Sequence, residues 1–253
     1  MNQVDFNTVL NDGAISVLSR RAVLGPWADR RLGPYDWRTD FDTGLAAFIA
    51  REGGGRIDFG WPQTLVSIAP GPGTILWSWA QPRSPKSLAA VNRLREFGQH
   101  YGIPQLTEPE VPFDRLGRDP GSYDSEDAML MDIAHRVAIV AGQVTDLPQY
   151  VIAAQGQSKS VILLPSSQVP LPTMRGFREA IDLALQAGYI TNVRRSLESA
   201  IQRLGFSADW RGDGRQVRIE GAGKSIELEF DEFGRVTTIR FAVDGEGILR
   251  DTE

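Results

Sequence analysis

The 253-residue chain contains no cysteine and only two histidines, His100 and His135. The absence of cysteine excludes disulfides, thiolate nucleophiles, iron–sulfur clusters and every cysteine-ligated zinc site. The two histidines belong to different expected helices and form no His-Glu-x-x-His motif, so they leave little for a metal site or a catalytic triad. We therefore expect no catalytic residue, no metal and no cofactor, and the sequence favours a protein that is not an enzyme.

The chain also lacks the long apolar run of about 18 residues that a membrane-spanning helix requires. Residues 1–6 have neither the basic start nor the apolar segment of a secretory signal. These two absences predict a cytoplasmic protein with no membrane association.

The composition is that of a globular protein, with 42% hydrophobic and 23% charged residues. Aspartate and glutamate total 32 against 27 lysine and arginine, which gives a net charge of −5. An acidic chain repels nucleic-acid phosphates and suits a basic protein partner. Ordinary solubility explains a small negative charge equally well.

The first two thirds of the chain read as an α+β domain over residues 1–164. Glycine and proline punctuation and hydrophobic periodicity predict an antiparallel sheet packed by helices. The expected helices span residues 4–24, 84–101 and 125–142, and the expected strands span residues 35–41, 45–49, 56–61, 64–69, 74–80, 150–154 and 160–164. We expect the first helix to stop at Gly25-Pro26, because proline cannot continue a helix.

A proline- and serine-rich linker over residues 165–172 precedes a smaller module over residues 173–253. The pattern there predicts two helices, at 173–187 and 191–204, and a four-stranded antiparallel meander. The expected strands are residues 206–210, 216–220, 225–230 and 236–243. The sequence leaves open whether this module is an independent domain, and it leaves the oligomeric state open.

Tryptophans mark the first part of the chain. Trp77 and Trp79 are spaced to lie on one face of the strand expected at residues 74–80, and Trp61 precedes the neighbouring strand. Together these three residues would form an aromatic cleft for a small ligand. A place in the hydrophobic core is the commoner role for tryptophans on a central strand.

The tryptophan strand and its surroundings resemble a known family. The segment from Thr74 to Pro82 contains a Trp-x-Trp-Ala-x-Pro motif and leads into a helix that ends at Gly102. This pattern is similar to that of an uncharacterised bacterial domain-of-unknown-function family, over about residues 35–164. The resemblance implies a bacterial source and an α+β fold, and it assigns no catalytic residue.

Residues 221–225 read Gly-Ala-Gly-Lys-Ser, like the end of a phosphate-binding P-loop. A P-loop must open a helix, whose first amides bind the phosphates. Residues 226–230 instead alternate between apolar and acidic side chains, as a strand does. We therefore interpret residues 221–225 as a hairpin turn.

The strongest charge feature lies between residues 108 and 132, which contain eight acids and two bases. The acids are Glu108, Glu110, Asp114, Asp119, Asp124, Glu126, Asp127 and Asp132, and the bases are Arg115 and Arg118. The first hypothesis is an acidic surface for protein–protein interaction, as in an immunity protein that blocks a basic toxin. Asp119, Asp124, Glu126 and Asp127 would then pair with lysine or arginine of the partner.

Two alternatives remain open at this point. The acidic segment could bind a divalent metal or supply carboxylates near His135 for hydrolysis. The tryptophans could form a small-molecule site. A solvated loop followed by acids in the first turn of a helix is the plainest interpretation of the same residues.

Overall fold

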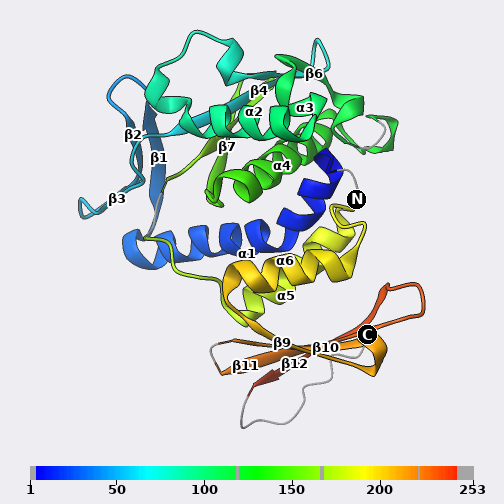
Figure 1. The fold of residues 1–253 in the computed structure, drawn as a ribbon. Helices are drawn as coiled ribbons and strands as arrows, with labels where there is room; N and C mark the ends of the chain where they lie inside the picture. Colours follow the sequence, from blue (N-terminus) through cyan, green and yellow to red (C-terminus); the bar gives the residue numbers. More distant parts are fainter. Residues whose placement is uncertain (1–3, 118–119, 166–167, 222, 244–253) are drawn as a thin grey trace. The chain divides into compact units, whose positions relative to one another are not determined.

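The computed structural model describes residues 4–117, 120–165, 168–221 and 223–243 (Figure 1). The fold is α+β, as the sequence predicted, with antiparallel sheets and helices packed on them. The chain forms two compact units. The first consists of residues 1–10 and 24–170, and the second consists of residues 11–23 and 171–253.

Helix α1 (Phe6–Leu32) supplies residues to both units. It begins at Asp5, whose side chain accepts a hydrogen bond from the Thr8 amide at 2.7 Å. The expected stop at residue 24 was wrong, because the helix continues through Pro26. Leu24 and Trp27 on either side of the proline are buried, so their packing offsets the cost of about 3 kcal/mol of an interior proline.

The first unit contains two antiparallel sheets. A three-stranded sheet has the order β1-β2-β3, and a five-stranded sheet has the order β6-β5-β4-β8-β7. Their strands are β1 (Tyr35–Asp40), β2 (Leu45–Ala50), β3 (Arg56–Asp58), β4 (Gln63–Ala69), β5 (Thr74–Trp77), β6 (Glu110–Pro112), β7 (Tyr150–Gln155) and β8 (Ser158–Leu163). The hairpins expected near residues 35–49 and 150–164 are confirmed.

The first unit also contains the helices α2 (Ala89–Tyr101), α3 (Pro104–Thr107) and α4 (Glu126–Thr145). Trp77 at the end of β5 donates its indole N–H to the Gln105 carbonyl oxygen of α3 at 2.9 Å. The long strand expected at residues 74–80 ends at Trp77, and Ser78–Ala80 form a 3₁₀ turn. Trp79 therefore lies outside the strand that carries Trp77.

The second unit contains α5 (Met174–Gln186), α6 (Val193–Leu204) and a four-stranded meander. The strands β9 (Ser207–Arg211), β10 (Gln216–Gly221), β11 (Lys224–Phe230) and β12 (Val236–Val243) pair in the order β12-β11-β10-β9, as the sequence predicted. The inward side chains of the sheet form one hydrophobic core with the helices. Its members include Ile15, Phe177, Ile181, Leu197, Val217, Ile219, Ile226 and Leu228.

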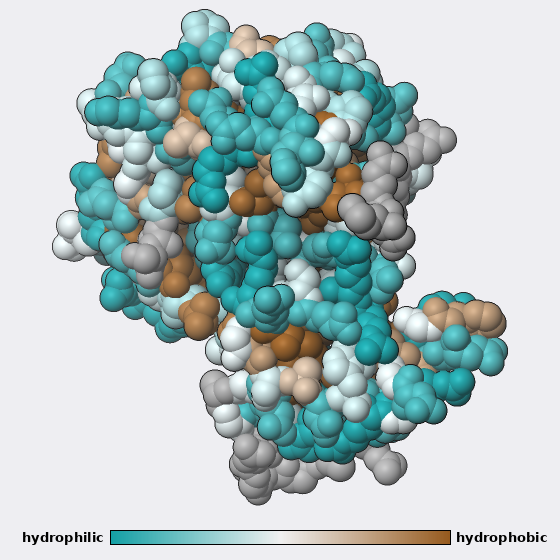
Figure 2. Space-filling view, in the orientation of Figure 1, coloured by the Kyte–Doolittle hydropathy of each residue, from teal (hydrophilic) through white to brown (hydrophobic). Residues whose placement is uncertain are grey.

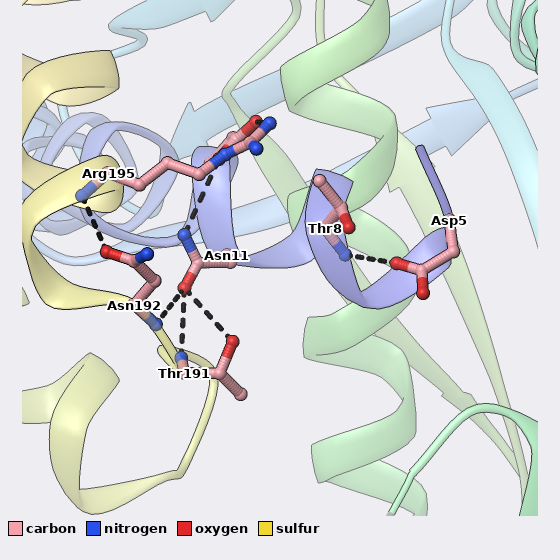
Figure 3. Close-up of polar contacts among 7 residues, drawn as sticks. Asp5, Thr8, Asn11, Thr191, Asn192 and Arg195 are labelled. Atoms are coloured by element: carbon pink, nitrogen blue, oxygen red, sulfur yellow. Dashed lines mark hydrogen bonds and ion pairs between the residues drawn. The ribbon is translucent and has the colours of Figure 1, made fainter. Parts of the chain in front are cut away.

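Polar contacts fix the α1 segment of the second unit to α6 (Figure 3). The Asn11 side-chain oxygen accepts hydrogen bonds from the backbone amides of Thr191 at 2.9 Å and Asn192 at 2.8 Å. Arg195 binds both carboxylate oxygens of Asp12, at 2.6 and 2.7 Å. Asn11 is only 2% exposed, so these hydrogen bonds satisfy its buried side-chain oxygen.

Candidate functional site

The N-terminal end of α4 carries most of the acidic residues that the sequence singled out. Ser125 caps the helix by accepting a hydrogen bond from the Ala128 amide at 3.1 Å. Asp124, Glu126 and Asp127 are exposed around this cap, where the helix dipole favours negative charge. Asp119 lies outside the described residues.

One of these carboxylates already has a basic partner. Lys159 of β8 forms an ion pair with Asp127, and the lysine side chain is only 14% exposed. Asp124 and Glu126 form no ion pair among the described residues. The three carboxylates and one ammonium leave a net charge of −2 at this end of α4.

Other acids of the same segment are neutralised within the fold. Arg115 binds both carboxylate oxygens of Glu108, and this hydrogen bonding lowers the pKa of Glu108. Arg136 donates to Asp132 at 2.7 Å, and both side chains are largely buried. The accessible charge of residues 108–132 is therefore smaller than their composition suggests. The acids that stay exposed among the described residues are Glu110, Asp114, Asp124, Glu126 and Asp127.

The three tryptophans have different surroundings. Trp77 is 1% exposed and belongs to the core. Trp61 and Trp79 are half-buried, with Lys86 at 4.7 Å from the ring centre of the first and Arg95 at 4.0 Å from that of the second. These cations cover one ring face of each half-buried tryptophan.

His135 lies against a buried tyrosine. Its Nδ1 atom is 2.7 Å from the hydroxyl oxygen of Tyr150, which is fully buried on β7. His100 is exposed in the last turn of α2. Within the described ranges, no group of three or more histidine, aspartate or glutamate side chains is placed to bind a metal ion.

The outward face of the C-terminal sheet carries a row of alternating charges that the sequence analysis did not identify. Asp209, Arg218, Glu227 and Arg240 lie opposite one another across the four strands. Arg218 donates to Glu227 at 3.2 Å and also to Glu220 at 2.6 Å. The hydrogen bond that Arg218 donates to Glu220 raises the pKa of Arg218, so the guanidinium stays charged. The only signal in the sequence was the alternation of charged residues along each strand.

Two pockets open on this face of the sheet. Arg211, Gln216, Val217, Arg218, Glu227, Leu228, Glu229 and Arg240 line the first. Ser207, Arg218, Glu220, Gly221, Gly223, Lys224 and Ser225 line the second, which has a volume of about 260 Å³. The coloured residues along the lower rim of Figure 2, where Figure 1 places this sheet, are mostly hydrophilic.

A family model matches residues 7–167, which is more than half of the chain. The chain belongs to the DUF6882 family. This family is described only as a family of unknown function. The DUF6882 match includes α1 and ends after β8, so it starts well before residue 35, where the sequence resemblance began. Neither a curated protein nor a solved structure shows significant similarity to the chain.

No helix within the described residues combines the length and the apolar character needed to cross a membrane.

Proposed function

We propose that this DUF6882 protein is a non-enzymatic bacterial protein of the cytoplasm that binds a basic protein partner. The binding surface is the exposed end of α4 with Asp124, Glu126 and Asp127. An immunity or antagonist protein that blocks a basic toxin is the concrete form of this function. The observation that carries the proposal is the exposure of Asp124 and Glu126 without any ion pair among the described residues.

The arrangement suits recognition of lysine or arginine side chains. Asp124 and Glu126 flank a capped helix end, so their backbone is ordered before a partner arrives. Lys159 holds Asp127 in place, which reduces the side-chain entropy that the surface loses on binding. Charges at the rim of an interface mainly accelerate encounter and exclude wrong partners, so the effect should appear in the association rate.

Affinity capture with the purified chain from cells of its source organism tests this function. The wild-type chain should retain a basic protein that the double variant Asp124→Asn/Glu126→Gln does not retain. The double variant Glu52→Gln/Glu96→Gln is the matched control, because it removes the same charge from exposed sites elsewhere in the first unit. The control should retain the partner as the wild type does.

The rate of association with the captured protein gives a second measurement. It should fall as the ionic strength rises from about 0.01 M to about 1 M, because the Debye length shrinks from about 30 Å to about 3 Å. Equal binding by the two double variants, or an association rate that does not change with salt, would show that the end of α4 is not the interface.

A further inference from the structure

The pocket at the β10–β11 hairpin combines positive charge with hydroxyl groups. Arg218 and Lys224 contribute two positive charges and Glu220 contributes one negative charge to its lining. Glu227, which also binds Arg218, brings this cluster to a net charge of zero. Ser207 and Ser225 supply the hydroxyls. The chain as a whole has a net charge of −5, so this cluster is less acidic than the chain average.

Ser225 has no hydrogen-bond partner for its hydroxyl among the described residues, although it is only 2% exposed. Its register partner is Glu220, whose side chain is on the outward face of the sheet, so Ser225 also faces outward, away from the core. A buried hydroxyl without a partner costs about 1–3 kcal/mol. A ligand in the pocket would satisfy it.

The two cations differ in how they are held. The Nε and Nη1 atoms of Arg218 donate to Glu220 and Glu227, which fixes the guanidinium, and neither of these hydrogen bonds uses its Nη2 group. Lys224 is exposed and forms no ion pair among the described residues. One oriented and one movable cation beside a hydroxyl can together neutralise and orient an oxyanion.

We propose that this pocket binds the phosphoryl group of a small molecule. Lys224 and the Nη2 group of Arg218 pair with its charge, and the Ser225 hydroxyl donates to one of its oxygens. The side chains supply the donors here, since the segment that resembled a P-loop forms a hairpin without a helix. The volume of about 260 Å³ lies below the range of about 300–1,000 Å³ for drug-sized ligands, so it suits inorganic phosphate or a small phosphomonoester.

The Ser225 oxygen is shielded from water, so a ligand reaches it only after a neighbouring group moves.

Calorimetric titration of the full chain tests the site, with inorganic phosphate and with O-phosphoserine as separate probes. Saturable binding of at least one probe is expected, and the probe that binds more tightly distinguishes the free ion from a phosphomonoester. Lys224→Gln and Ser225→Ala should each weaken binding about tenfold or more, because hydrogen bonds to charged groups contribute about 1.5–3 kcal/mol. Arg235→Gln is the matched control, since it removes one positive charge from the turn between β11 and β12, outside the residues that line the pocket.

Thermal unfolding without ligand separates lost binding from lost folding. Ser225→Ala should melt at the same temperature as the wild type or higher, because it removes a hydroxyl that the fold does not satisfy. A variant that binds less but is at least as stable supports a ligand site. Absence of saturable binding of both probes, or equal affinity of the wild type, Lys224→Gln and Ser225→Ala, would overturn the proposal.

Discussion

The side-chain oxygen of Asn11 lies 2.8 Å from the backbone nitrogen of Asn192, a residue 181 positions later in the chain. Asn192 caps α6 with its own side chain, which accepts a hydrogen bond from the Arg195 amide at 3.0 Å. Asn11 therefore fixes the residue that starts α6. Residues 11–23 and the C-terminal residues share one compact unit, and this hydrogen bond is part of what joins them.

Replacement of Asn11 by alanine should lower the free energy of unfolding by about 1–3 kcal/mol. The variant removes the acceptor shared by the amides of Thr191 and Asn192, and each of these two hydrogen bonds contributes about 0.5–1.5 kcal/mol. Urea denaturation of the full chain measures the loss. Asn92→Ala on the exposed surface of α2 should change stability by less than about 0.5 kcal/mol, and equal losses in both variants would contradict the prediction.

Replacement of Ile15 by alanine should destabilise the second unit by about 2–5 kcal/mol. Ile15 is fully buried in the core with Phe177 and Leu197, so truncation leaves a cavity among residues that pack around it. Hydrogen exchange of the full chain should show lower protection for amides of α5, α6 and β10. Unchanged protection there would mean that α1 is dispensable for this core.

Replacement of Asp132 by alanine should cost about 3 kcal/mol of stability. Arg136, which is 5% exposed, would lose the carboxylate that binds it at 2.7 Å, and Tyr123 would lose its acceptor at 2.6 Å. Adding Arg136→Met should restore part of the loss, since a buried charge that has lost this carboxylate is then removed. Asp124→Ala, which has no such partner, should fall within about 0.5 kcal/mol of the wild type in the same thermal unfolding assay.

The hairpin between β11 and β12 should weaken in acid. The backbone amide of Arg235 donates to the Asp231 carboxylate at 2.9 Å, and this hydrogen bond is the main cause that lowers the pKa of Asp231 below its ordinary value of 3.8. Because the folded pKa is the lower one, the stabilisation is complete above pH 3.8 and is lost as the pH falls through the folded value.

Nuclear magnetic resonance of the hairpin amides during an acid titration measures this effect. The Arg235 amide should titrate with Asp231 at a pH below 3.8. In Asp231→Asn the same amide should show no such transition. A transition in the wild type at or above pH 3.8 would contradict the assigned cause.

Several elements could be predicted because their signals are local. Ser125 and Gly102 mark the ends of helices, and the hairpins at residues 150–164 and over the last four strands follow from alternation and turn residues. The predicted end of α1 at residue 24 was wrong. Packing of the buried residues Leu24 and Trp27 outweighs the tendency of Pro26 to end a helix. The strand that carries Trp77 ends at that residue, whereas the alternating pattern of residues 74–80 predicted a strand to Ala80. The alternation does not indicate the 3₁₀ turn that follows.

For the candidate sites too, the sequence identified some residues but not the contacts between them. The sequence identified Asp124, Glu126 and Asp127, but not that Lys159 would neutralise Asp127 from a strand 32 positions away. It also identified the glycines around Lys224, yet only the pairing of β9, β10 and β11 places Ser207, Arg218 and Ser225 around one pocket.

The amino-acid sequence by itself determined the α+β class, most of the helices and strands of both parts, and the family, but it did not predict α3 or β6. These depend on composition, periodicity and end signals that act over a few residues. Only the tertiary structure decided that residues 11–23 share a core with residues 171–253, which carboxylates remain unpaired, and where a cation meets an unsatisfied hydroxyl. Such contacts join side chains far apart in the chain, so their free energies exist only after the elements have packed.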